Sequence, residues 1–93
     1  MFRISETEKQ SRTVVTVDGY LSSDSIKVVE TCCNQAKSTG KPVDLFLRDV
    51  PTIDQAGRAL LRRLAASGVR LLASGVYTSY IVRALTPTRD RDG

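Results

Sequence analysis

Residues 41–64 read KPVDLFLRDVPTIDQAGRALLRRL and contain the transition that decides the fold. In the first part, residues 42–50, apolar residues alternate on one face while Phe46 lies on the other, which is typical of an interior strand. After Asp54 the apolar residues take helical spacing, and the predicted buried stripe is Leu60, Leu61, Leu64 and Ala65. The segment therefore predicts one strand-to-helix unit of an α/β domain.

The segments before this unit predict a hairpin and a helix. Phe2 and Ile4 alternate with polar residues, as in a short edge strand, and residues 13–19, TVVTVDG, are rich in β-branched residues. The short polar link between these strands favours an antiparallel pair. Residues 22–25, SSDS, offer several N-caps for a helix over about 24–38.

The segments after the unit predict a strand and a short helix. Residues 69–74, VRLLAS, form a third interior-type strand. The following apolar stripe fits one face of a helix and consists of Tyr77, Tyr80, Ile81, Ala84 and Leu85. Pro87 ends this helix, and we expect the polar residues 87–93 to be a disordered tail.

The order of elements is β-β-α-β-α-β-α, which predicts a single α/β domain over residues 1–86. Strands joined through helices are usually parallel, with right-handed crossovers. The expected architecture is thus a mixed, mainly parallel four-stranded sheet whose helices lie mostly on one face.

Composition excludes several classes of function. The chain has 93 residues, a net charge of +4, five aromatic residues and no His. Without His it lacks the commonest general base and zinc ligand, so no metal site is expected. The basic residues are scattered, which argues against nucleic-acid binding. No signal peptide or membrane-length apolar run is present, so we expect a cytoplasmic protein that does not insert into membranes.

The junction PTIDQAGRALL, residues 51–61, is the strongest candidate site. Asp54 is best explained as a helix cap, although a reactive carboxylate is the alternative. Gly57 permits close approach of another group to its backbone, or simply tight packing. Arg58 and the free amides of the helix start could attract an anion. Because no base or acidic cluster accompanies these residues, we predict no catalytic residues, no cofactor and no enzyme activity.

The sequence as a whole resembles a STAS domain, the family named after sulfate transporters and anti-sigma factor antagonists. The resemblance runs from Thr13 to Leu85 and rests on VVTVDGYLSSDS, the 41–64 block and GVRLLASGVYTSYIVRAL. It is strongest with free-standing bacterial antagonists, which implies signalling and regulation of transcription. In those proteins the residue after the Asp is a Ser or Thr that a partner kinase phosphorylates. Here that position is Gln55, which cannot be phosphorylated, so the usual switch is expected to be absent.

The resemblance also implies a partner-binding surface. We expect it at the helix start, joined by part of the loop after the second strand, where a common Gly-x-Leu-Asp pattern reads Gly19 to Ser22. The predicted partner-binding residues are Thr52, Asp54, Gln55, Ala56, Gly57, Arg58, Tyr20 and Ser22. The family commonly adds a further strand and helix, so an open sheet edge could accept a partner or a second copy in a homodimer.

Three hypotheses of function follow. The first is a non-enzymatic regulatory module that binds an anti-sigma kinase-like ATPase. In the second, the chain has the same fold but is a small STAS subunit that regulates the ATPase of a lipid-transporting ABC system. The third is an enzyme or nucleotide-hydrolysing protein, which would need a catalytic constellation that the sequence lacks.

Overall fold

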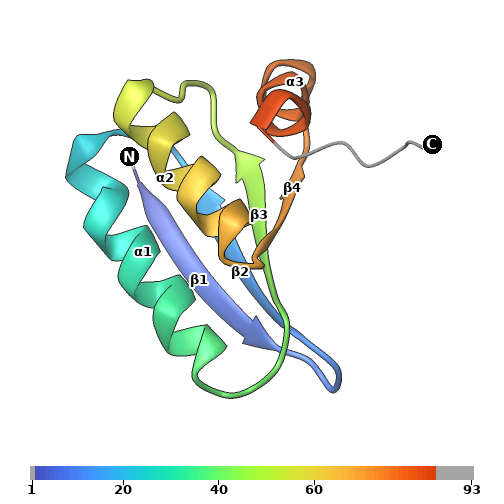
Figure 1. Ribbon diagram of the computed structural model, residues 1–93. Coiled ribbons are helices and arrows are strands. Elements are labelled where there is room, and N and C mark those ends of the chain that lie inside the picture. Colours follow the sequence, from blue (N-terminus) through green and yellow to red (C-terminus); the bar gives the residue numbers. More distant parts are fainter. Residues whose placement is uncertain (1, 86–93) are drawn as a thin grey trace.

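The computed structural model describes residues 2–85 and has the predicted order of elements (Figure 1). Its strands and helices are β1 (Arg3–Glu8), β2 (Thr13–Asp18), α1 (Ser23–Lys37), β3 (Val43–Asp49), α2 (Gln55–Ala66), β4 (Arg70–Ala73) and α3 (Val76–Leu85). The expected tail at 87–93 lies outside the described residues. No helix within residues 2–85 is long and apolar enough to cross a membrane.

The four strands form one mixed sheet in the order β1-β2-β3-β4. β1 and β2 are antiparallel, with Arg3 opposite Asp18, whereas β2, β3 and β4 are parallel. Each parallel connection passes through a helix, as the change from strand to helix spacing predicted. The predicted α/β class and the mainly parallel sheet are therefore confirmed.

The helices cover one face of this sheet. Figure 1 shows α1 and α2 side by side across it, while α3 lies next to β4. The side chains buried between sheet and helices include Val15, Val17, Leu45, Leu47, Val29, Cys33, Leu60, Leu61 and Leu64. Alternate residues of the strands point to the opposite face, which no helix of the described chain covers.

The buried stripe of α3 differs from the predicted one. Ile81 is buried as expected, but Thr78 and Val82 are buried too. Tyr77 and Tyr80 are 43% and 71% exposed, and Ala84 is exposed as well. The Thr78 hydroxyl donates a 2.8 Å hydrogen bond to the Val50 carbonyl, which fixes this face of the helix against the end of β3. The prediction counted each tyrosine as apolar, although a phenol places its hydroxyl in water at little cost.

The adjacent cysteines of α1 form no disulfide. Cys33 is buried in the core, and this burial raises the pKa of its thiol from 9.0 to about 12. Cys32 is half-buried, and its pKa is raised by burial and by the nearby carboxylate of Glu6. Cys33 therefore packs as a small apolar side chain of the core.

We expect Cys33 to be almost inert in the folded protein, since the thiolate is the reactive form. In a Cys32→Ser variant at pH 8, iodoacetamide should modify Cys33 at least about a thousandfold more slowly in the native than in the urea-unfolded state, because three pKa units change the thiolate population by that factor. Mass spectrometry of the quenched samples measures both rates. Equal rates would show that this part of α1 opens readily.

Candidate functional site

The loops that follow β2 and β3 are joined to each other by backbone hydrogen bonds. The Gly19 amide donates to the Asp49 carbonyl at 2.7 Å, and the Leu21 amide donates to the Thr52 carbonyl at 3.2 Å. The Asp54 amide then donates to the Leu21 carbonyl, also at 3.2 Å. Parallel pairing thus continues past the strands to a bridge between Leu21 and Ile53. The start of α2 is consequently attached to the loop after β2.

Asp54 caps α2, as predicted. Its side-chain Oδ1 accepts a 2.8 Å hydrogen bond from the Gly57 amide, and its carbonyl accepts a 2.9 Å bond from the Arg58 amide. The bond to Gly57 satisfies an amide that the helix cannot pair internally, and the bond from Arg58 is the first backbone bond of the helix. The negative charge of Asp54 lies at the positive end of the helix dipole. The carboxylate is therefore occupied in holding the helix start.

Gly57 is buried against the loop after β2. A Cβ atom at this position would lie 2.7 Å from the Leu21 carbonyl oxygen and 2.9 Å from Cγ2 of Ile53. The first contact is with backbone, which cannot rotate away. Gly57 is thus required because α2 begins in direct contact with Leu21, and any contribution to partner binding would come from its backbone.

The other predicted binding residues lie mostly on the surface. The exposed ones are Tyr20, Thr52, Asp54, Gln55, Ala56 and Arg58. Gln55 is the first residue of α2, directly after the cap. We call residues 52–58 together with Tyr20 and Ser22 the docking turn. That a partner contacts it stays a prediction.

Ser22 is half-buried and belongs to the cap of α1. Its amide donates a 3.1 Å hydrogen bond to Oγ of Ser25, whose hydroxyl lies 3.2 Å from the Tyr20 carbonyl and bonds to it. Ser25 is buried and was not predicted as a site residue. These bonds fix the backbone of the loop, so that Tyr20 projects from a rigid base.

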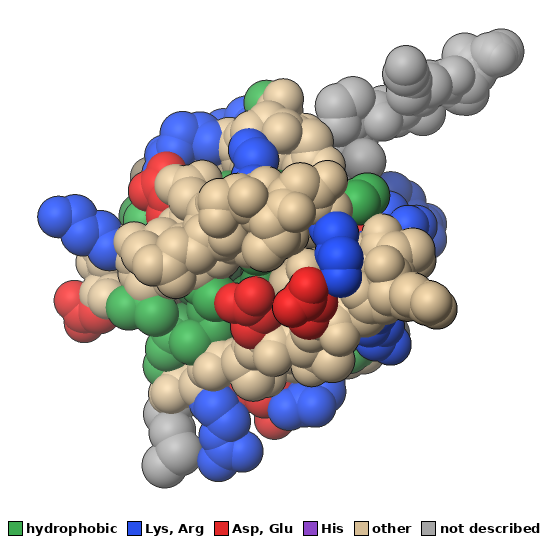
Figure 2. Space-filling view, turned by 90° about the horizontal axis from the view of Figure 1, so that it is seen from below, with side chains coloured by type: hydrophobic (Ala, Val, Ile, Leu, Met, Phe, Trp, Pro, Cys, Tyr) green, Lys and Arg blue, Asp and Glu red, His purple; other side chains and the backbone are tan. Residues whose placement is uncertain are grey.

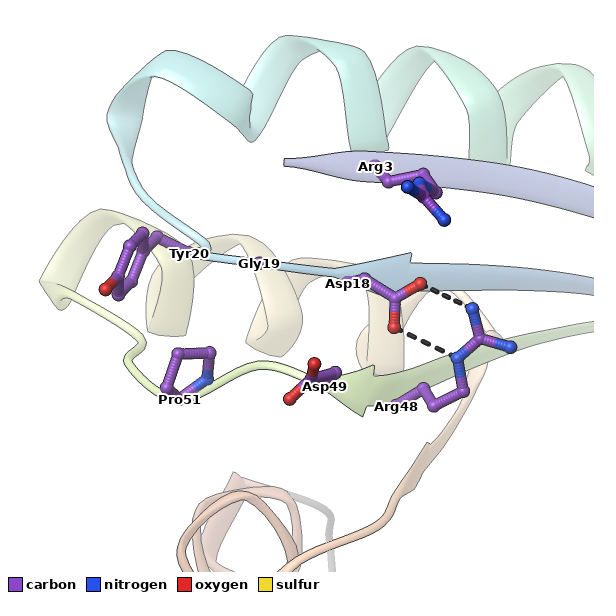
Figure 3. Close-up of a pocket in the computed structure, with 7 residues that line it drawn as sticks. All are labelled: Arg3, Asp18, Gly19, Tyr20, Arg48, Asp49 and Pro51. Carbon is purple, nitrogen blue, oxygen red and sulfur yellow. Dashed lines mark hydrogen bonds and ion pairs between the residues drawn. The ribbon is translucent and has the colours of Figure 1, made fainter. Parts of the chain in front are cut away.

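A pocket of about 590 Å³ lies beside the docking turn, where the uncovered face of the sheet meets the loops. Figure 3 shows its lining residues, which are Arg3, Asp18, Gly19, Tyr20, Arg48, Asp49 and Pro51. Asp18 and Arg48 form a two-bond ion pair, with Nε to Oδ1 at 3.0 Å and Nη2 to Oδ2 at 2.5 Å. This bonding holds the pKa of Asp18 below its usual value.

Sequence reasoning missed Arg3 and Arg48 as residues of this pocket. Each occupies a strand position that points away from the helices, where a charged residue is ordinarily read as solvated surface. Only the pairing register brings these residues together, because Arg3 lies opposite Asp18, and Arg48 immediately precedes the residue that pairs with Asp18 on β3.

The described residues contain no group of three or more Cys, Asp or Glu side chains placed to hold a metal ion. On the face shown in Figure 2, Lys and Arg side chains are spread around the molecule and separated by acidic and uncharged groups. The basic charge on this face therefore does not form a continuous patch.

The fold is similar to those of solved structures. The model superposes with a TM-score of 0.57 on an uncharacterised protein of the DUF3478 family from Shewanella loihica PV-4, described as having a SpoIIAA-like fold. The two are 10% identical, over 89% of this chain and 75% of the other. This domain therefore has a SpoIIAA-like, STAS-like fold, as the resemblance implied.

A second solved structure, described as that of Mglu, matches with a TM-score of 0.60 and 25% identity. The match covers 77% of this chain but only 19% of Mglu, so a similar domain also occurs as a small part of a much longer chain. No model of a known protein family and no curated protein sequence matches.

We expect Gly57→Ala to destabilise the protein by about 1–3 kcal/mol, since the new methyl group must displace the Leu21 backbone. Urea unfolding followed by circular dichroism measures the change. Ala56→Gly is the matched control, because Ala56 is exposed in the same turn and this change costs no more than about 1 kcal/mol of helix propensity. An unchanged or raised stability of Gly57→Ala would contradict the close contact.

Proposed function

We propose that the chain is a protein-binding regulatory module of the anti-sigma factor antagonist type, without catalytic activity of its own. The SpoIIAA-like fold supports a module of this kind. The observation that carries the proposal is the docking turn, where exposed polar side chains project from a helix start whose backbone is bonded to a neighbouring loop.

The rigidity of the docking turn favours binding. Asp54 and Gly57 fix the start of α2, and Ser25 fixes the loop that carries Tyr20. A preorganised surface loses little conformational entropy when a partner binds. The exposed Gln55 and Arg58 side chains then offer hydrogen bonds and one positive charge without being needed for the core.

Gln55 has the place that a switchable hydroxyl has in the antagonists. It is exposed, so the position is accessible, but an amide accepts no phosphate. A phosphate there would add up to two negative charges and would repel an acidic partner surface. With a neutral amide, we propose that the chain stays in the binding-competent state and does not respond to the kinase.

Affinity capture from the native cell tests the proposal, with Gln55→Glu as the informative variant. The added charge should weaken partner binding about tenfold, which equals 1.4 kcal/mol. Gln35→Glu is the matched control, because it makes the same change on an exposed part of α1. Mass spectrometry should identify an ATPase-fold kinase or sigma regulator that is retained by the wild type and by the Gln35 variant.

Recovery of an ABC ATPase instead would assign the chain to the transporter alternative. Equal binding of the Gln55 and Gln35 variants would refute the docking turn as the contact surface. Restoring the hydroxyl with Gln55→Ser supplies an independent check, since a bound kinase should then phosphorylate the protein. Absence of phosphorylation by a kinase proven to bind would contradict the assignment of Gln55 to the switch position.

A further inference from the structure

The face of the sheet opposite the helices is the most distinctive surface that the docking turn does not include. Its residues are arranged in three rows across the strands, as the pairing register shows. We call it the open face. Its members are Arg3, Ser5, Thr7, Val14, Thr16, Asp18, Asp44, Phe46, Arg48, Arg70 and Leu72, with Arg12 bonded to Asp44 at one end.

The middle row of the open face is partly apolar. Thr16 pairs with Phe46, and Phe46 pairs with Leu72, so these side chains lie side by side on three neighbouring strands. Val14 lies in the next row. All four are half-buried, although no helix of residues 2–85 covers them. Partly exposed apolar side chains gathered at the centre of a sheet are suited to contact with another surface.

The two outer rows of the open face carry its arginines. At one end Arg12 and Arg70 both bond to Asp44, at 2.7 Å and 3.0 Å. At the other end Arg48 bonds to Asp18, and Arg3 has no ion pair within the described chain (Figure 3). Asp49 lines the same pocket as Arg3, Arg48 and Asp18, so four arginines meet three aspartates and one positive charge is unmatched. The side chains of Arg70 and Arg48 are 59% and 55% exposed and can accept further partners.

The spacing of the rows determines which partner structure fits the open face. Asp44 and Arg48 are four residues apart on β3, so the two ends that carry arginines are separated by roughly 13 Å, with Phe46 midway. Two turns of an α-helix advance about 11 Å. This is slightly less than the separation of the two rows, and the long arginine side chains can make up the difference. A helix with acidic residues two turns apart and apolar residues between them therefore matches both the charge and the apolar centre.

We propose that the open face binds an acidic amphipathic helix of a partner protein. The helix would add a third layer to the domain, covering Phe46 and Leu72 and pairing its carboxylates with Arg3 and Arg48 at one end and with Arg70 at the other. Helices on both faces are a common arrangement for α/β sheets. The proposal does not depend on the docking turn, although Tyr20 of that turn lines the same pocket as Arg3 and Arg48 of the open face.

A single nucleic-acid strand is the competing occupant, because it too is anionic and could stack on an aromatic side chain. The open face offers one aromatic residue, Phe46, and it is half-buried. Stacking platforms for single strands use several exposed aromatic side chains in succession. The apolar centre between two ends that carry exposed arginines therefore favours a protein helix.

The test uses a fluorescent alanine-based helical peptide of about 18 residues, long enough to form helix in water. It carries glutamates two turns apart and leucines between them, and a second peptide has lysines in place of the glutamates. Fluorescence anisotropy at low salt should show binding of the acidic peptide by the full chain, and at least tenfold weaker binding of the basic one.

Two variants locate the site. Arg3→Glu and Leu72→Lys should each weaken binding of the acidic peptide at least fivefold. Their matched controls are Arg62→Glu and Val28→Lys, which make the same changes at exposed positions of α2 and α1 and should bind as the wild type does. Circular dichroism should show that all four variants are folded.

Several results would overturn the proposal. These are no binding of the acidic peptide at millimolar protein concentration, equal binding of both peptides, or equal effects of the face variants and their controls. Tighter binding of a single-stranded oligouridine through the same residues would replace the helix by nucleic acid. A dimer in sedimentation that Leu72→Lys abolishes would show that a second copy occupies the open face.

Discussion

The contact between Gly57 and the Leu21 carbonyl is the constraint on which the arrangement of this domain depends. A Cβ atom at Gly57 would lie 2.7 Å from that oxygen, so only glycine allows α2 to begin there. The same carbonyl accepts the Asp54 amide. One backbone oxygen therefore positions the cap of α2, its first turn and the loop after β2. The shape of the surface proposed for partner binding is consequently set by backbone geometry, and its exposed side chains are not needed for the fold.

The fold was largely predictable from the sequence because its signals are local. Alternating apolar residues around Phe46, the change of spacing after Asp54 and the caps all act within a few residues, and each was read correctly. Asp54 illustrates this well, since its cap bond spans three positions. The order of strands and helices then predicted the mainly parallel topology, which the SpoIIAA-like fold of a solved structure supports.

The features that were not predicted from the sequence depend on contacts between residues far apart in the chain. Tyr77 and Tyr80 were assigned to the buried stripe of α3, but the orientation of that helix is set by the bond from Thr78 to Val50, 28 positions away. The pocket beside the docking turn was missed for a similar reason, because Arg3, Asp18 and Arg48 come together only through strand pairing. Hydrophobic spacing describes one element at a time and gives no information on contacts between side chains of different elements.

The ion pairs of Asp44 have a consequence for how the sheet assembles. This carboxylate is nearly completely buried, and it bonds to Arg12 just before β2 and to Arg70 at the start of β4. β4 has only four residues, so few backbone bonds fix its alignment with β3. A slip of one residue would turn Arg70 toward the helices and leave Asp44 with one arginine fewer. A buried charge is costly when it loses a partner, so misaligned forms of the sheet are penalised. Asp44 thus favours the observed register of the shortest strand over other registers that hydrophobic packing alone would permit.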